Sequence, residues 1–191
     1  MRSLSQLGGV FLAVVLAAVS GCASAPNAIG ESTSSFDGST EYRLNPGFIY
    51  RNASTFSSGD VQLGLLWRTG MGDEVMVEAV VAQQIVNIAS DGLLFNIDGD
   101  IIELHSDQAL TDFETSRHSG MTFKSSSRWF TTDLQTIERM LGAESAKVKL
   151  VTGDGFLEGD FKADKPSAAI RGFKEFVAKV RAVKGEVATG S

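Results

Sequence analysis

Apolar and polar residues alternate along two neighbouring stretches of the chain, residues 61–68 and residues 75–81. A period of two puts every second side chain on the same face, as in a half-buried β-strand. These stretches predict an antiparallel hairpin with one dry face. Trp67 belongs to the apolar set, so we expect it to be buried. Weaker strand patterns precede this hairpin at residues 40–44 and 48–51.

A second hairpin is predicted around Asp98-Gly99, because this dipeptide is typical of a two-residue turn between strands. The turn fixes which residues face each other across the two strands. The facing pairs are Phe95 with Ile102 and Leu93 with Leu104 on one side, and Asn96 with Ile101 and Leu94 with Glu103 on the other. One side of this hairpin is therefore fully apolar.

The last hairpin has two possible registers, with either Gly153-Asp154 or Asp154-Gly155 as its turn. The second choice would set Val151 against Glu158, whereas the first separates charged from apolar pairs, so we favour the first. Its pairs are Lys149 with Glu158, Lys147 with Asp160 and Val151 with Phe156 on one side, and Leu150 with Leu157 and Ala146 with Phe161 on the other.

Two helices are predicted. The first begins at Thr132, whose hydroxyl and the Gln135 side chain can form a capping box, and it ends at Gly142 in a left-handed conformation. The second starts near Asp164 and Pro166. Its apolar stripe has helical spacing and should cover a sheet. That stripe consists of Ile170, Phe173, Phe176, Val177 and Val180.

Residues 105–126 lack a clear period and contain both histidines, so we expect a long connection before a short strand at 128–131. Trp129 and Phe130 are adjacent on that strand and should point to opposite faces. The pattern predicts an α+β fold, in which an antiparallel sheet of about six to eight short strands is covered by two helices. A β-sandwich with peripheral helices is the alternative.

The N-terminal segment has the features of a targeting signal. Arg2 precedes an uncharged apolar run that extends to Val19, which is typical of a secretory signal and shorter than the about 20 residues of a spanning helix. Val19-Ser20-Gly21-Cys22 resembles the lipobox of bacterial lipoproteins. The resemblance implies cleavage before Cys22 and acylation of that residue, for example with palmitate. Ala23, in place of an Asp, resembles the Gram-negative rule for sorting to the outer membrane.

These features divide the chain into a signal peptide at 1–21, a lipidated flexible tether at 22–36, one globular domain at 37–184 and a disordered tail at 185–191. Cys22 is the only cysteine, so a lipidated Cys22 leaves no thiol for a disulfide, a metal or catalysis. We expect a lipid-anchored domain in the bacterial cell envelope, on the outer membrane and facing the periplasm.

The formal net charge of −6 disfavours nucleic acid as a partner. Basic residues nevertheless gather in the segment 165–184. The ordinary interpretation is the solvated face of one helix, and a partner-binding surface is the alternative. The candidate residues are Arg171, Lys174, Lys179, Arg181 and Lys184.

Candidate chemistry is sparse. Asp98, Asp100 and Glu103 lack the spacing of a calcium loop, so a plain turn is the favoured interpretation. A zinc site would need His105 and His118, joined by one of the carboxylates Asp107, Asp112 and Glu114. No nucleophile elbow or phosphate-binding glycine loop occurs in the sequence. We therefore assign no catalytic residue, no metal ligand and no cofactor.

The mature chain resembles a group of uncharacterised proteobacterial envelope lipoproteins. The residues that carry the resemblance are Phe36-Asp37-Gly38, Leu63-Gly64 with Trp67, Phe95-Asn96-Ile97-Asp98-Gly99, Asp154-Gly155 with Glu158, and Phe173 with Phe176. The resemblance implies an envelope address and no particular activity. The expected function is a non-enzymatic module that binds an envelope protein or a cell-wall component; a periplasmic hydrolase with its site in residues 105–120 is the alternative.

Overall fold

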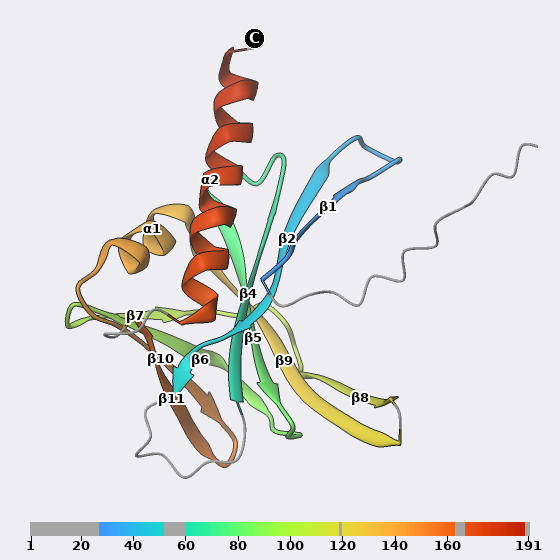
Figure 1. Ribbon diagram of the computed structural model, residues 1–191, viewed down its shortest axis with the longest axis vertical. Helices are drawn as coiled ribbons and strands as arrows, with labels where there is room; N and C mark the ends of the chain where they lie inside the picture. Colours follow the sequence, from blue (N-terminus) through green and yellow to red (C-terminus); the bar gives the residue numbers. More distant parts are fainter. Residues whose placement is uncertain (1–26, 52–59, 119, 163–166, 190–191) are drawn as a thin grey trace, which may run out of the picture.

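The alternating patterns fold into two antiparallel sheets with two helices packed against them (Figure 1). The computed structural model describes residues 27–51, 60–118, 120–162 and 167–189. The larger sheet has the strand order β1-β2-β4-β5-β9-β8. Its strands are β1 (Ile29–Thr33), β2 (Thr40–Phe48), β4 (Asp60–Arg68), β5 (Glu74–Ala82), β8 (Asp112–His118) and β9 (Met121–Asp133).

The smaller sheet has the order β3-β11-β10-β6-β7. Its strands are β3 (Tyr50–Arg51), β6 (Ile88–Ile97), β7 (Asp100–Leu104), β10 (Ala146–Thr152) and β11 (Gly155–Lys162). Helix α1 (Leu134–Gly142) follows β9, and helix α2 (Ala168–Thr189) follows β11. The α+β class is confirmed, but the strands outnumber the predicted six to eight and divide into two sheets.

The two sheets are joined at two places. Strand β2 runs through the buried Ile49 directly into β3, so one stretch of chain serves both sheets. On the other side, His105 follows β7 and forms an isolated bridge with Thr131 of β9. The inner faces of both sheets therefore contribute to one continuous core, which also takes in the buried sides of α1 and α2.

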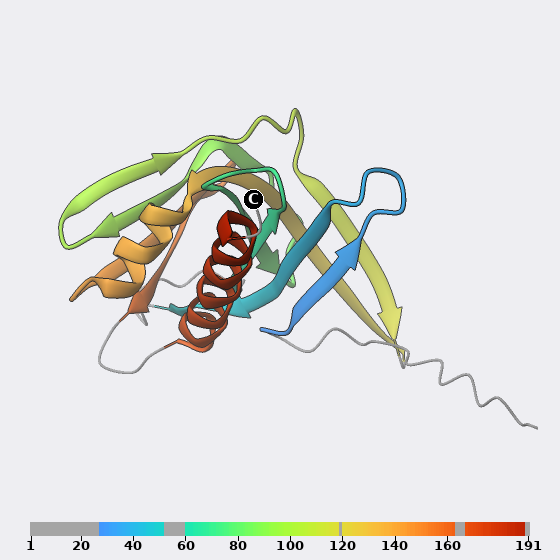
Figure 2. The ribbon, with the colours of Figure 1, turned by 90° about the horizontal axis from the view of Figure 1, so that it is seen from above.

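Helix α2 lies along β2 and over the open side between the sheets (Figure 2). Its predicted apolar stripe is buried: Phe173 and Phe176 are inaccessible to solvent. Phe173 meets Phe161 of β11 edge to face, with ring centres 5.0 Å apart. This is a favourable geometry for two aromatic rings and adds to the area that they bury.

The predicted registers of the hairpins are confirmed. Phe95 lies opposite Ile102 across the Asp98-Gly99 turn, and Lys149 lies opposite Glu158 across the Gly153-Asp154 turn. Trp67 is buried, and Phe130 is buried while its neighbour Trp129 is partly exposed. One predicted pair is wrong. Ala146 faces Lys162 rather than Phe161, because an irregularity between Ala146 and Lys147 shifts the end of the ladder.

The predicted cap of the first helix is also wrong. Thr132 remains in β9, where it pairs with Val75, and the N-cap is Asp133, whose carboxylate accepts a hydrogen bond of 2.6 Å from the Thr136 N–H. Gly142 is the last helical residue and has no left-handed backbone; the C-cap is Ala143. Sheet pairing thus extends β9 past the point where the local sequence predicts a helix.

Part of the predicted tether is a strand. Residues 29–33 form β1, which pairs with β2. The chain is already packed at Asn27, because a Cβ at Gly47 would lie 2.0 Å from the Asn27 Oδ1 and a Cβ at Gly172 would lie 3.1 Å from its Cβ. Glycine at these two positions therefore permits the N-terminal segment to lie between β2 and α2.

Two further predictions are corrected. Residues 105–126 do not form a single connection, since β8 and the first part of β9 make a hairpin within them. Helix α2 continues to Thr189, so it includes most of the segment predicted as a disordered tail. The signal peptide, Cys22, and the start of the second helix at Asp164 and Pro166 lie outside the described residues.

Arg128 holds the junction between the sheets. It lies on the inner face of β9 and is buried, and its guanidinium donates to the carbonyl oxygens of Ile88 and Gln108 and, at 3.1 Å, to the Ser106 hydroxyl. Ile88 begins β6, so this one side chain connects the larger sheet to the smaller. The planar, multiply donating guanidinium suits several acceptors at once.

Replacing Arg128 with Met should destabilise the domain by about 2–4 kcal/mol, because each buried carbonyl left without a donor costs about 1–3 kcal/mol. Urea unfolding followed by circular dichroism measures the loss. Lys124→Met is the matched control, since Lys124 is an exposed residue of the same strand. Equal stability of the two variants would contradict the assigned role of Arg128.

Candidate binding site on the five-stranded sheet

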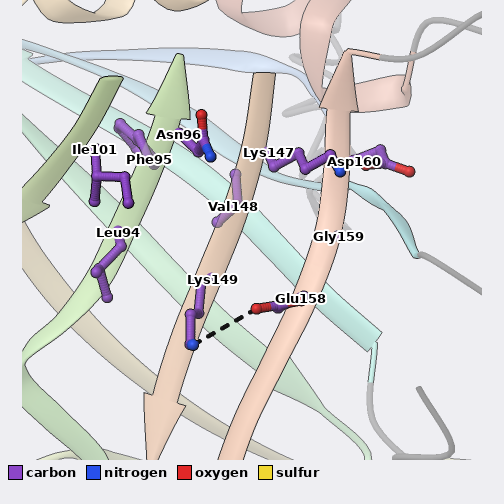
Figure 3. Close-up of a pocket in the computed structure, with 10 residues that line it drawn as sticks. All are labelled: Leu94, Phe95, Asn96, Ile101, Lys147, Val148, Lys149, Glu158, Gly159 and Asp160. Carbon is purple, nitrogen blue, oxygen red and sulfur yellow. Dashed lines mark ion pairs between the residues drawn. The ribbon is translucent and has the colours of Figure 1, made fainter. Parts of the chain in front are cut away.

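The outer face of the five-stranded sheet carries a shallow pocket of about 340 Å³ (Figure 3). Side chains alternate along β6 and β10, so Phe95 and Val148 turn into the core while their neighbours point outward. The outward residues form two rows across the strands. One row is Ile101, Asn96, Lys147 and Asp160, and the other is Glu103, Leu94, Lys149 and Glu158.

Two lysines of β10 lie in the middle of this pocket. Lys149 Nζ is 3.6 Å from the Glu158 Oε1 and 4.0 Å from the ring centre of Phe156. Lys147 lies opposite Asp160 in the ladder, yet no ion pair of Lys147 occurs among the described residues. Lys147 is also exposed. Its ammonium group is therefore placed to donate to an anionic ligand.

Apolar side chains flank the lysines on the side of β6 and β7. Ile101 is 65% exposed, and Leu94 is partly exposed beside it. Ile101 and the cation Lys147 therefore give the pocket an apolar side and a charged side. Asn96 lies between them and can both donate and accept hydrogen bonds. Such a surface suits a ligand that combines an anion with a small apolar group.

His105 is the residue on which a hydrolase in the 105–120 segment would depend. Its Nδ1 contacts the Asp91 carboxylate, and its Nε2 lies 3.6 Å from the Asp107 Oδ1. The hydrogen bond to Asp91 raises the pKa of His105 above its ordinary value, and His105 in turn lowers the pKa of Asp91. Carboxylates contact both ring nitrogens and stabilise the protonated imidazolium.

The described residues contain no group of three His, Cys, Asp or Glu side chains arranged to hold a metal ion. Two carboxylates near the Asp98-Gly99 turn are bound to protein groups rather than arranged around a metal. Asp98 Oδ1 accepts from the Ser145 N–H at 2.7 Å, and Asp100 pairs with Arg139 at 2.7 Å. Asp112 and Glu114 lie on β8, and the side chain of His118 is outside the described part of the structure.

A half-buried ion pair lies on the outer face of the larger sheet, where an exposed arginine covers a buried glutamate. Arg43 donates to both carboxylate oxygens of Glu78, at 2.9 and 3.2 Å, and its guanidinium lies 5.1 Å from the ring centre of Trp129. Burial raises the pKa of Glu78, an effect that the charge of Arg43 opposes. Each of the two charges has its partner within this cluster. We therefore interpret it as a structural ion pair rather than a ligand site.

The basic residues of α2 divide into two groups. Arg181 forms two hydrogen bonds of 2.8 Å with Glu138, Lys179 lies 3.3 Å from Glu31, and Lys184 contacts Asp73. These three attach the helix to α1, to β1 and to the turn between β4 and β5. Arg171 and Lys174 are exposed, and no partner for them is found among the described residues. Most of the basic face predicted from the sequence therefore forms ion pairs within the molecule.

Cys22, the predicted lipidation site, precedes the first described residue. Within the described ranges, neither helix combines the length and the apolar character that crossing a bilayer requires.

Lys147 and Lys149 were predicted to share a face with Glu158 and Asp160. Their combination with Leu94 and Ile101 was missed, because it depends on the pairing of β10 with β6, which are distant in the sequence.

Asp91→Asn should bring the pKa of His105 down toward its ordinary value of 6.5, because the hydrogen bond to Asp91 is the main cause of the increase. With the folded pKa raised, the stabilisation from this contact is complete below about pH 6.5 and is lost as the pH rises through the folded pKa. Titration of the histidine ring signals by NMR measures the change. Asp107→Asn should have a smaller effect, and the opposite order would contradict the assigned geometry.

Comparison with known protein families, with curated proteins and with solved structures found no match.

Proposed function

We propose that this protein is a lipid-anchored envelope protein without catalytic activity, which binds a peptide segment through the pocket around Lys147. The lipobox-like sequence that ends at Cys22 supports the anchor and the envelope location. The observation that carries the binding function is the pocket on the outer face of the smaller sheet, in which the exposed Lys147 and the exposed Ile101 lie on either side of Asn96. The outer membrane is the proposed site of attachment, with the domain in the periplasm.

The pocket defines the chemistry of the ligand. Lys147 would pair with a carboxylate, while Leu94 and Ile101 would contact a small apolar side chain. Glu158 and Asp160 border the lysines on the other side and would repel a polyanion such as nucleic acid. A peptide that carries one carboxylate next to an alkyl group meets these conditions. Both an envelope protein and the peptide part of the cell wall could offer such a segment.

Cys22→Ala should abolish incorporation of radiolabelled palmitate and remove the protein from the membrane fraction, or leave it unprocessed, because acyl chains are its proposed membrane attachment. The wild type should carry the label and sediment with the outer membrane in a density gradient. Ser20→Ala is a useful control, since it keeps the cysteine. A wild type that is processed and soluble but unlabelled would exclude the anchor.

A photo-crosslinking residue at position 101 should capture a defined product in intact cells, and Lys147→Glu should reduce that product about tenfold, as expected when about 1.4 kcal/mol of binding is lost. Lys174→Glu is the matched control, because Lys174 is also exposed but lies on α2. The same crosslinker at Phe36, which is 99% exposed in the β1–β2 turn, sets the background. A product at position 101 no stronger than this background would reject the binding site.

A further inference from the structure

Strand β8 offers the longest open edge among the described strands. It is the last strand of the larger sheet and has seven residues, Asp112–His118. The other edge strands, β1, β7 and β3, have five, five and two residues. Together with β9, it forms a hairpin that lies on the side of the sheet away from α1 and α2 (Figure 1). An edge of this length exposes backbone donors and acceptors that can pair with another strand.

The ladder fixes which residues of β8 present these groups. On β9, the N–H groups of Trp129 and Thr131 point toward the β8 side, where they donate to the Gln108 side chain and the His105 carbonyl oxygen. The carbonyl of Lys124 points the other way and accepts from Gln83 at the end of β5. Odd-numbered residues of β9 therefore bond toward β8, and even-numbered ones toward β5.

In the observed register, odd residues of β9 lie opposite even residues of β8, as in the pair of Glu114 with Ser125. The even residues of β8 consequently bond to β9. The backbone groups of Phe113, Thr115 and Arg117 point to the open edge. Any strand that adds to this sheet must match these three residues.

We propose that a second copy of the chain pairs with this edge, β8 against β8 in antiparallel orientation, with Thr115 on the two-fold axis. In that register Phe113 of one copy lies opposite Arg117 of the other, and Thr115 lies opposite its own symmetry mate. All three outward-facing residues then form hydrogen-bonded pairs, each of which exchanges two backbone bonds. The interface is isologous, as a closed dimer requires.

The side chains of β8 are compatible with this pairing. Phe113 is 52% exposed, and an arginine opposite an aromatic ring is a favourable cross-strand pair. Glu114 would lie opposite Ser116 of the second copy, so no like charges meet there. Moving the axis to Glu114 would pair Phe113 with Thr115 and leave Arg117 beyond the ladder. The register centred on Thr115 therefore forms the most hydrogen bonds from the outward-facing residues.

A single pair of short strands buries less area than the about 1,600 Å² of a stable interface, so the dimer should depend on concentration. Attachment of both copies to one surface would favour it, because it raises their effective concentration. This second point rests on the proposed lipid anchor, whereas the pairing itself does not.

Thr115→Cys in the full-length chain tests the pairing. Cysteines at a hydrogen-bonded antiparallel pair have Cα atoms about 5.5 Å apart, within the range that a disulfide spans. Mild oxidation of intact cells should therefore produce a disulfide-linked dimer on a non-reducing gel. The unmodified chain controls for Cys22, and Thr33→Cys places a matched exposed cysteine on β1, the opposite edge of the same sheet.

Adding Arg117→Pro to Thr115→Cys should reduce the dimer at least about tenfold. Proline removes the outward-facing N–H of residue 117 and leaves the β8–β9 bonds intact, as edge positions allow. An unchanged circular-dichroism spectrum would show that the fold persists, and Phe113→Asp with Thr115→Cys gives a second disruption without proline. The proposal is overturned if Thr115→Cys crosslinks no more than Thr33→Cys, or if neither disruption lowers the yield.

Discussion

The fold depends on keeping two incomplete sheets closed around one core. Neither sheet has a second layer of its own strands, so the inner face of each must be covered by the other sheet and by the helices. The sheets are joined where β2 passes through Ile49 into β3, by the bridge between His105 and Thr131, and by Arg128, which binds two carbonyls and a hydroxyl. A buried guanidinium is costly to desolvate, and here its hydrogen bonds compensate for that cost. The apolar face of helix α2 then covers the side that the joints leave open.

The sequence predicts the features that short-range chemistry determines. The registers at Asp98-Gly99 and Gly153-Asp154 follow from turn geometry and from alternation, both of which are local. The start of α1 is not local: Thr132 could cap a helix, but pairing with Val75 keeps it in the sheet and passes the cap to Asp133. The strands β1 and β8 were missed because both are edge strands with mostly exposed side chains, and an edge strand needs no apolar alternation.

The candidate site was predictable in part. The positions of Lys147, Lys149, Glu158 and Asp160 on one face follow from a single hairpin. Their neighbours Leu94 and Ile101 arrive through the pairing of β10 with β6, which no local pattern indicates. The same limit applies to α2. Its basic face is visible in the sequence, but the acids that neutralise Lys179, Arg181 and Lys184 come from three separate segments.

The packing of Asn27 against β2 and α2 has a consequence for movement at a surface. If Cys22 bears the lipid, only residues 22–26 separate it from the folded body, and they span at most about 18 Å in any conformation. A domain held this closely cannot sweep through the space between two membranes. It would instead diffuse laterally with its anchor, and it would meet only those molecules that also lie within a few nanometres of the same bilayer.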